Sequence, residues 1–181
     1  MRGHKENTML AKAFMLSAAT LALAGCASVP EGGGPATVQV PLSHYSGTWL
    51  EIGRRPMWLT DGCVAGYSTY SSDEKGEVAV EDGCYKDTPS GKLKTIRGQG
   101  TIEDFGGANA KLKVRYPLFI TWHYWVLYEA PDNSWFISAD PKMKNLWIYA
   151  RKVPSDAERS VMVAKAKELG YDTNQLEFPA F

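Results

Sequence analysis

The chain has 181 residues, 44% of them hydrophobic, and its 20 Lys and Arg side chains balance 20 Asp and Glu. A formal net charge of zero gives no basic field that would attract nucleic acid or an anionic lipid surface, so no nucleic-acid partner is expected. This length suits a single domain that buries roughly two-thirds of its unfolded surface.

The N-terminus has the pattern of a bacterial lipoprotein signal. Residues 1–12 carry three basic side chains and one acid, and Ala13–Leu23 is an apolar run too short to span a bilayer. The run ends in Leu-Ala-Gly followed by Cys26, which resembles a lipobox, where the Cys receives diacylglycerol and palmitate. A plain signal peptide with a coincidental Cys is the alternative. We predict a signal peptide over residues 1–25 and a lipid anchor at Cys26.

Residues 26–42 predict a flexible tether, because they are rich in Gly and Pro and have no hydrophobic period. A coil of this length reaches roughly 20 Å, which would keep the domain close to the membrane. Ala27 in place of Asp after the anchor residue fits sorting to the outer membrane, as such signals are generally interpreted. We therefore expect a domain over residues 43–181 that faces the periplasm.

Eight segments bounded by turn residues have strand character. They are Thr48–Gly53, Cys63–Ser71, Glu77–Tyr85, Leu93–Glu103, Ala110–Tyr116, Thr121–Ala130, Ser134–Asp140 and Asn145–Arg151. Eight short strands at near-regular spacing favour an all-β up-and-down barrel or a sandwich.

The alternation of side chains separates the two faces of these strands. In the fifth strand Leu112, Val114 and Tyr116 share an inward face, and in the fourth strand Ile96 shares one with two glycines, which would leave open space. The sixth and eighth strands are apolar on both faces, so something must cover the outside. The capping box at Ser155 predicts a helix that ends near Leu169 and supplies this cover.

Two cysteines flank the hairpin of the second and third strands. In an oxidising compartment Cys63 and Cys84 would form a disulfide. If Ser71 pairs opposite Gly76, the two sulfurs face each other across the ladder. The alternative is a reactive thiol, although no His or Lys lies nearby in sequence to lower its pKa.

Gly47-Thr48-Trp49 enters the first strand, and Arg151 leaves the last. Together these residues resemble the signature of the lipocalin family. The resemblance implies an eight-stranded antiparallel up-and-down β-barrel with one C-terminal helix packed outside. It also implies that Trp49 plugs the closed end and that Arg151 packs across the indole, where a guanidinium supplies cation–π attraction and hydrogen bonds.

Within that family the chain is most similar to bacterial outer-membrane lipoproteins and to their apolipoprotein D and plant temperature-induced relatives. The matching segments are Tyr45-x-Gly47-Thr48-Trp49-x-Glu51-Ile52, Tyr124-Trp125-Val126-Leu127 and Leu146-Trp147-Ile148-x-x-Arg151. Leu50 stands where Tyr is usual, and Tyr128 begins a segment that departs from the common pattern.

The resemblance implies binding of a fatty acid or lysophospholipid, for lipid transport, storage or envelope maintenance. Arg54 or Arg55 at the rim would hold a head group. Glu51 would either touch the ligand or make a structural hydrogen bond. The expected ligand contacts are Glu51, Trp58, Ile96, Leu112, Val114, Tyr116, Tyr124 and Val126.

Two other functions stay open. An enzyme acting on a lipid or pigment would have only Cys63, Cys84 and Glu51 as eligible groups, and we predict no catalytic residue and no cofactor. A structural envelope protein would have a filled barrel. His44 and His123 have no partner nearby in sequence, so no metal site is predicted. The sequence does not determine the ligand or the oligomeric state.

Overall fold

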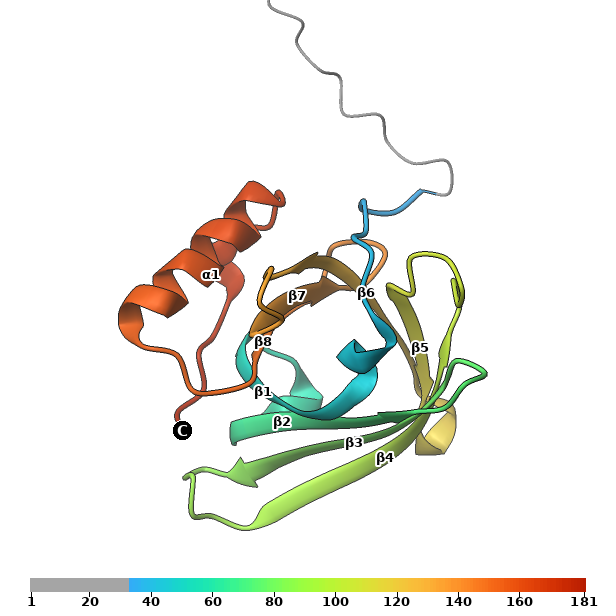
Figure 1. The fold of residues 1–181 in the computed structure, drawn as a ribbon. Helices are drawn as coiled ribbons and strands as arrows, with labels where there is room; N and C mark the ends of the chain where they lie inside the picture. The colour runs from blue at the N-terminus through green and yellow to red at the C-terminus, as the bar shows by residue number, and fades with distance from the viewer. Residues whose placement is uncertain (1–32) are drawn as a thin grey trace, which may run out of the picture.

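The computed structural model describes residues 33–181, which form a closed antiparallel barrel with a helix on its outside (Figure 1). The strands follow one another around the barrel in chain order. They are β1 (Ser46–Arg54), β2 (Cys63–Ser72), β3 (Glu77–Lys86), β4 (Leu93–Ile102), β5 (Lys111–Arg115), β6 (Thr121–Glu129), β7 (Trp135–Ala139) and β8 (Leu146–Ala150). The predicted up-and-down barrel is confirmed, and each strand limit lies within two residues of its expected position.

One α-helix, α1 (Asp156–Glu168), follows the barrel. The Ser155 side chain accepts a hydrogen bond from the backbone N–H of Glu158, and the Glu158 carboxylate accepts one from the backbone N–H of Ser155, so the predicted capping box is present. Four short 3-10 helices occupy loops: η1 (Leu42–Tyr45), η2 (Trp58–Thr60), η3 (Pro117–Phe119) and η4 (Thr173–Gln175). Within residues 33–181, no helix is both long and apolar enough to cross a bilayer.

The outside of the barrel is apolar where α1 covers it. Ile137 of β7 and Ile148 of β8 are buried against Met162 and Ala166 of the helix (Figure 1). This second core explains why β6 and β8 are apolar on both faces, because one face points into the barrel and the other meets the helix.

Trp49 closes one end of the barrel, as the signature implied. Its ring is completely buried, and the Arg151 guanidinium lies 3.4 Å from its centroid. Arg151 Nη1 also donates to the Thr48 carbonyl oxygen at 3.0 Å, and Trp49 Nε1 donates to the His44 carbonyl oxygen at 2.9 Å. The Phe136 ring meets the indole edge-on at 4.8 Å. The predicted stack of Trp49 and Arg151 is confirmed.

The packed domain begins before residue 43. The Val38 N–H donates to the Val126 carbonyl at 3.1 Å, the Val40 N–H donates to the Ala108 carbonyl at 2.9 Å, and Val40 is buried. This segment therefore joins the closed end of the barrel rather than acting as a tether. The expected signal peptide, Cys26 and residues 26–32 lie outside the described residues.

His44 lies in this plug and has a carboxylate partner from a distant part of the chain. Its Nδ1 is 2.8 Å from Glu129 Oε1, although 85 residues separate the two. Burial lowers the pKa of His44 more than Glu129 raises it. The pair is a structural contact that sequence spacing could not reveal.

The predicted disulfide between Cys63 and Cys84 is present, with the two Cα atoms 5.4 Å apart. The register from which it was predicted is wrong, because Ser71 pairs with Ala79 and Cys63 pairs with Lys86. Cys84 lies two residues before Lys86, on the same face of β3. The disulfide is therefore diagonal across the ladder.

Two local features account for the register. The Asp73 carboxylate accepts the backbone N–H groups of Lys75 and Glu77 at 2.8 and 2.9 Å, which closes the hairpin at a different pair of residues than expected. A bulge between Val64 and Tyr67 then shifts the pairing by one residue.

Trp49→Ala should lower the free energy of unfolding by about 3–5 kcal/mol, the usual cost of an indole lost from a core. Arg151→Lys keeps the charge but loses the planar fork, so it should cost about 1 kcal/mol. Urea unfolding measures both. Arg115→Lys, at an exposed end of β5, is the matched control, and an Arg151→Lys variant as stable as this control would contradict the proposed role of the stack.

Candidate ligand-binding cavity

The closed half of the barrel interior is filled by side chains. A Cβ atom at Gly98 would lie 2.5 Å from Val114 Cγ1, and one at Gly100 would lie 2.9 Å from Leu112 Cδ1. The two glycines of β4 thus allow β5 side chains to approach closely, and they do not leave the open space expected from sequence.

Three expected ligand contacts belong to this filled half. Leu112, Val114 and Val126 are buried in one core cluster with Trp49, and they are not among the residues that line the cavity above it. Their inward direction was predicted correctly, but direction alone does not tell whether a neighbouring side chain fills the space in front of a residue.

The open half of the barrel holds a cavity of about 360 Å³, here called the lumen cavity. Sites for small ligands commonly have volumes of about 300–1,000 Å³. Four expected ligand contacts line it: Glu51, Ile96, Tyr116 and Tyr124. The other lining residues are Arg54, Met57, Leu59, Thr60, Cys63, Tyr67, Ser68, Asp82, Gly83, Cys84, Lys94, Thr95, Ile120, Trp122, Trp147 and Tyr149.

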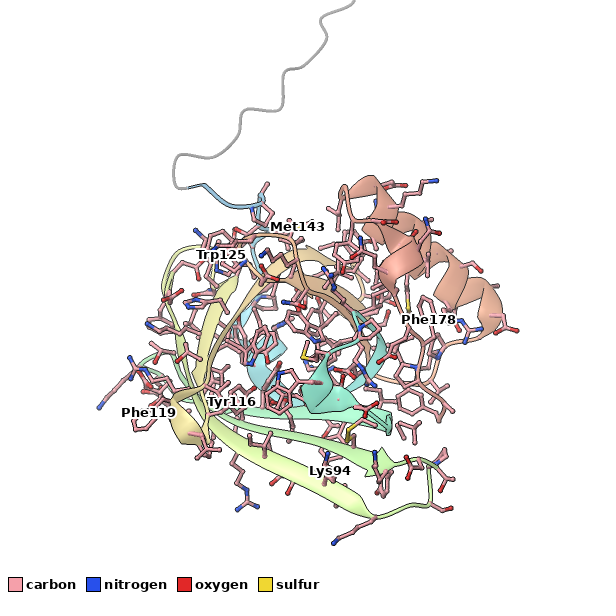
Figure 2. All side chains as sticks on the ribbon, turned by 180° about the vertical axis from the view of Figure 1, so that it is seen from behind. Lys94, Tyr116, Phe119, Trp125, Met143 and Phe178 are labelled. Carbon is pink, nitrogen blue, oxygen red and sulfur yellow. A yellow bond between two sulfur atoms is a disulfide. The ribbon has the colours of Figure 1, made fainter. Side chains whose placement is uncertain are left out.

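The loop between β1 and β2, which contains η2, borders the mouth. Met57 and Leu59 line the lumen cavity, whereas Trp58 is 79% exposed and lines an open groove shared with the C-terminal segment. Trp58 is therefore not a lumen residue, because neighbours in a short helix point in different directions. At η3, Leu118 is 86% exposed, and Phe119 projects away from the barrel (Figure 2).

Arg54 and Arg55, expected to hold a head group, have protein partners. Arg54 is only 2% exposed, donates to Glu51 and donates through Nε to Glu177 at 2.6 Å. Its Nη2 donates to the Cys63 carbonyl oxygen at 2.8 Å. Arg55 donates to the carbonyl oxygen of Lys144 at 2.7 Å. Burial raises the pKa of Glu51 in spite of Arg54.

Asp82 places a second carboxylate in the lumen cavity. It lies directly opposite Ser68 in the β2–β3 ladder, and Ser68 Oγ donates to Asp82 Oδ1 at 2.5 Å. The Tyr116 hydroxyl donates to Asp82 Oδ2, also at 2.5 Å. No Lys, Arg or His among residues 33–181 forms an ion pair with Asp82. Burial raises the pKa of Asp82 more than the two hydroxyl donors lower it.

Aromatic rings form the wall of the cavity on the β6 and β8 side. Trp122 and Trp147 meet at 88° with centroids 6.0 Å apart, and the Tyr124 ring lies 4.8 Å from that of Trp147. The Tyr124 hydroxyl lies 3.3 Å from that of Tyr116, and the Tyr149 hydroxyl lies 3.4 Å from Ser68 Oγ. The wall thus combines ring faces with a hydroxyl network that leads to Asp82.

The groups eligible for catalysis or metal binding have other contacts. Cys63 and Cys84 are joined in the disulfide, and His123 lies 3.2 Å from Glu103 at the protein surface. In the described part of the chain, no group of three or more His, Cys, Asp or Glu side chains is arranged to hold a metal ion.

The sequence analysis did not identify Asp82, Trp122, Trp147 or Tyr149 as site residues. A signal for Asp82 was available, because it shares the inward face of β3 with Val78 and Val80. A lone acid on an otherwise apolar strand face indicates either a partner or a function.

A family model described as a lipocalin-like domain matches residues 40–180. The chain is 31% identical over 144 residues to temperature-induced lipocalin-1 of Arabidopsis thaliana, covering 75% of this chain and 76% of the plant protein. Insecticyanin from the tobacco hornworm Manduca sexta superposes with a TM-score of 0.62 at 17% identity, covering 82% of this chain and 84% of insecticyanin. Lobster apocrustacyanin A1 superposes with a TM-score of 0.59 at 15% identity, covering 84% of this chain and 93% of apocrustacyanin A1. At these identities, the solved structures show a common fold alone.

Asp82→Asn should be more stable than the wild-type protein at pH 7, and this difference in stability should disappear in acid. A carboxyl whose folded-state pKa is raised favours the folded state below its unfolded pKa, about 3.9 for Asp, and loses that contribution as the pH rises through the folded value. The amide mimics the protonated form at every pH. Melting temperatures from pH 4 to pH 8 measure the difference.

Glu81→Gln is the control, since this neighbouring carboxylate pairs with Arg97 on the outer face. If Asp82→Asn raises the melting temperature by the same amount at pH 4 and at pH 8, the ionisation of Asp82 is not the cause of the increase.

Proposed function

Because the chain belongs to the lipocalin family, we propose that it binds a small apolar ligand in the lumen cavity. The observation that carries this proposal is the cavity of about 360 Å³ in the open half of the barrel, above a closed half filled around Trp49. Aromatic and aliphatic side chains dominate its lining and a few polar groups converge in it, which is the usual form of a small-molecule site.

The ligand that fits this cavity is a single-chain amphiphile. Each methylene transferred from water to the cavity contributes about 0.8 kcal/mol. Of the two lipids expected from the resemblance, a fatty acid would bring its carboxylate toward Glu51 and Asp82, while Arg54 is already bonded to Glu51 and Glu177. A lysophospholipid with an amino head group also carries a phosphate anion, but its ammonium group can pair with one of these carboxylates, so we prefer it.

We further propose that Cys26 carries a lipid anchor that holds the domain at the outer membrane, facing the periplasm, for lipid transport, storage or envelope maintenance. The lipobox-like sequence supports the anchor. The Cys63–Cys84 disulfide supports an oxidising compartment such as the periplasm. Val38 and Val40 join the closed end of the barrel, so an anchor upstream of them would leave the mouth free.

The rival functions have less support. An enzyme using a thiol nucleophile would need Cys63 or Cys84 reduced, and these two are bonded to each other. A purely structural protein with a filled barrel would not need the lumen cavity.

Ile120→Asp should weaken binding of N-phenyl-1-naphthylamine, a neutral apolar fluorophore, by about tenfold or more, because a charge would enter the lumen cavity that Ile120 lines. Fluorescence titration gives the Kd. Leu118→Asp places the same charge two residues away on the exposed side of the loop and should change the Kd by no more than about twofold. Equal effects of the two variants, or no binding by the wild-type chain, would contradict binding in the cavity.

Cys26→Ala should abolish incorporation of radiolabelled palmitate and leave an unprocessed precursor, because the acylated thiol is then missing. Labelling of cells followed by gel electrophoresis checks this, with Cys63→Ala as the control that retains the label. A Cys26→Ala protein of mature size in the membrane fraction would rule out the anchor.

A further inference from the structure

We infer that the lumen cavity selects organic cations: an ammonium group of the ligand pairs with Asp82 beside the aromatic wall of β6 and β8. The inference rests on the proposed ligand binding and names the chemical class of the ligand.

The Asp82 carboxylate has free acceptor capacity that faces the cavity. A carboxylate offers about four lone-pair positions, and Ser68 and Tyr116 each donate to a different oxygen. One position on each oxygen therefore stays open. Asp82 itself lines the cavity, so a donor that enters from the mouth reaches the carboxylate directly.

Residues 33–181 supply no cation to this carboxylate. Arg54 lies between Glu51 and Glu177 and is bonded to both. Lys94 lies at the mouth on β4 and is exposed (Figure 2), but it forms no ion pair with Asp82. Among the described residues, two carboxylates, Glu51 and Asp82, thus line the lumen cavity, against one guanidinium that is already bonded and Lys94 at the mouth. A buried carboxylate without a cation is unfavourable, and a cationic ligand removes this imbalance.

The aromatic wall favours the same ligand independently of the carboxylate. Ring faces carry negative electrostatic potential, and ammonium groups bind to sets of aromatic rings for this reason. Trp122 and Trp147 form a corner at 88°, and Tyr124 lies beside Trp147. Tyr116 belongs both to this wall and to the partners of Asp82. A cation in the cavity therefore finds the carboxylate and these aromatic rings in the same lining.

Three probes with the same ten-carbon chain separate charge from apolar binding: decylammonium, decan-1-ol and decanoate. Isothermal titration of the full chain gives each Kd. We expect the cation to bind at least about tenfold more tightly than the alcohol, and the alcohol more tightly than the acid. In Asp82→Asn the Kd ratio of alcohol to cation should fall to about one-third or less of the wild-type ratio, while the Kd of the alcohol stays within about twofold.

Glu81→Gln is the matched control, because it removes an equal charge from the next residue of the same strand, on the outer face. It should leave all three Kd values unchanged. A cation preference that survives Asp82→Asn, or falls equally in Glu81→Gln, would overturn the inference. Decanoate binding tightest would overturn it as well, and would point to Lys94.

The two proposals fail in distinguishable ways. If decan-1-ol binds and the cation has no advantage in the wild-type chain, cation selection is wrong and apolar binding in the cavity stands. If none of the three probes binds, the proposed function fails too.

Discussion

The pairing of β1 with β8 is the contact on which the rest of the molecule depends. It joins the first and last strands, so the sheet has no free edge and encloses an interior. Trp49 and Arg151 lie at this seam, where the guanidinium covers the indole and is bonded to the backbone of β1. The seam thus closes the sheet and fills one end. The other end is open and holds the lumen cavity.

Strand irregularities determine which charges enter the lumen cavity. Ile52 faces the helix-covered core, as alternation from Glu51 requires. The β1–β8 register shifts between Glu51 and Gly53, which keeps Gly53 on that outer side as well and turns Arg54 inward beside Glu51. Strict alternation would have placed Gly53 inside. A bulge adds one residue to one strand only and reverses the direction of every later side chain. The guanidinium therefore reaches the interior but is bonded there, which leaves Asp82 as the carboxylate without a cation.

The cavity shows the usual conflict between stability and function. A chain optimised only for stability would have an apolar residue at position 82, because burial disfavours the ionised carboxylate. Ser68 and Tyr116 offset part of this cost by donating to both oxygens, which also fixes the carboxylate in one orientation. Such rigid placement is what a binding site needs from its polar groups.

The strands and the helix cap could be predicted from local periodicity and capping chemistry, and the stack of Trp49 and Arg151 from a family signature. The Cys63–Cys84 bond could be predicted from two cysteines in an oxidising compartment, although the register proposed for it was wrong. The strand register, the filling of the closed half and the environment of Asp82 became visible in the folded barrel alone. Register follows from bulges that have weak local signals. Filling depends on side chains of different strands competing for one volume, as at Gly98 and Val114. Charge pairing joins residues far apart in the chain, and no spacing in the sequence reports their distance in space.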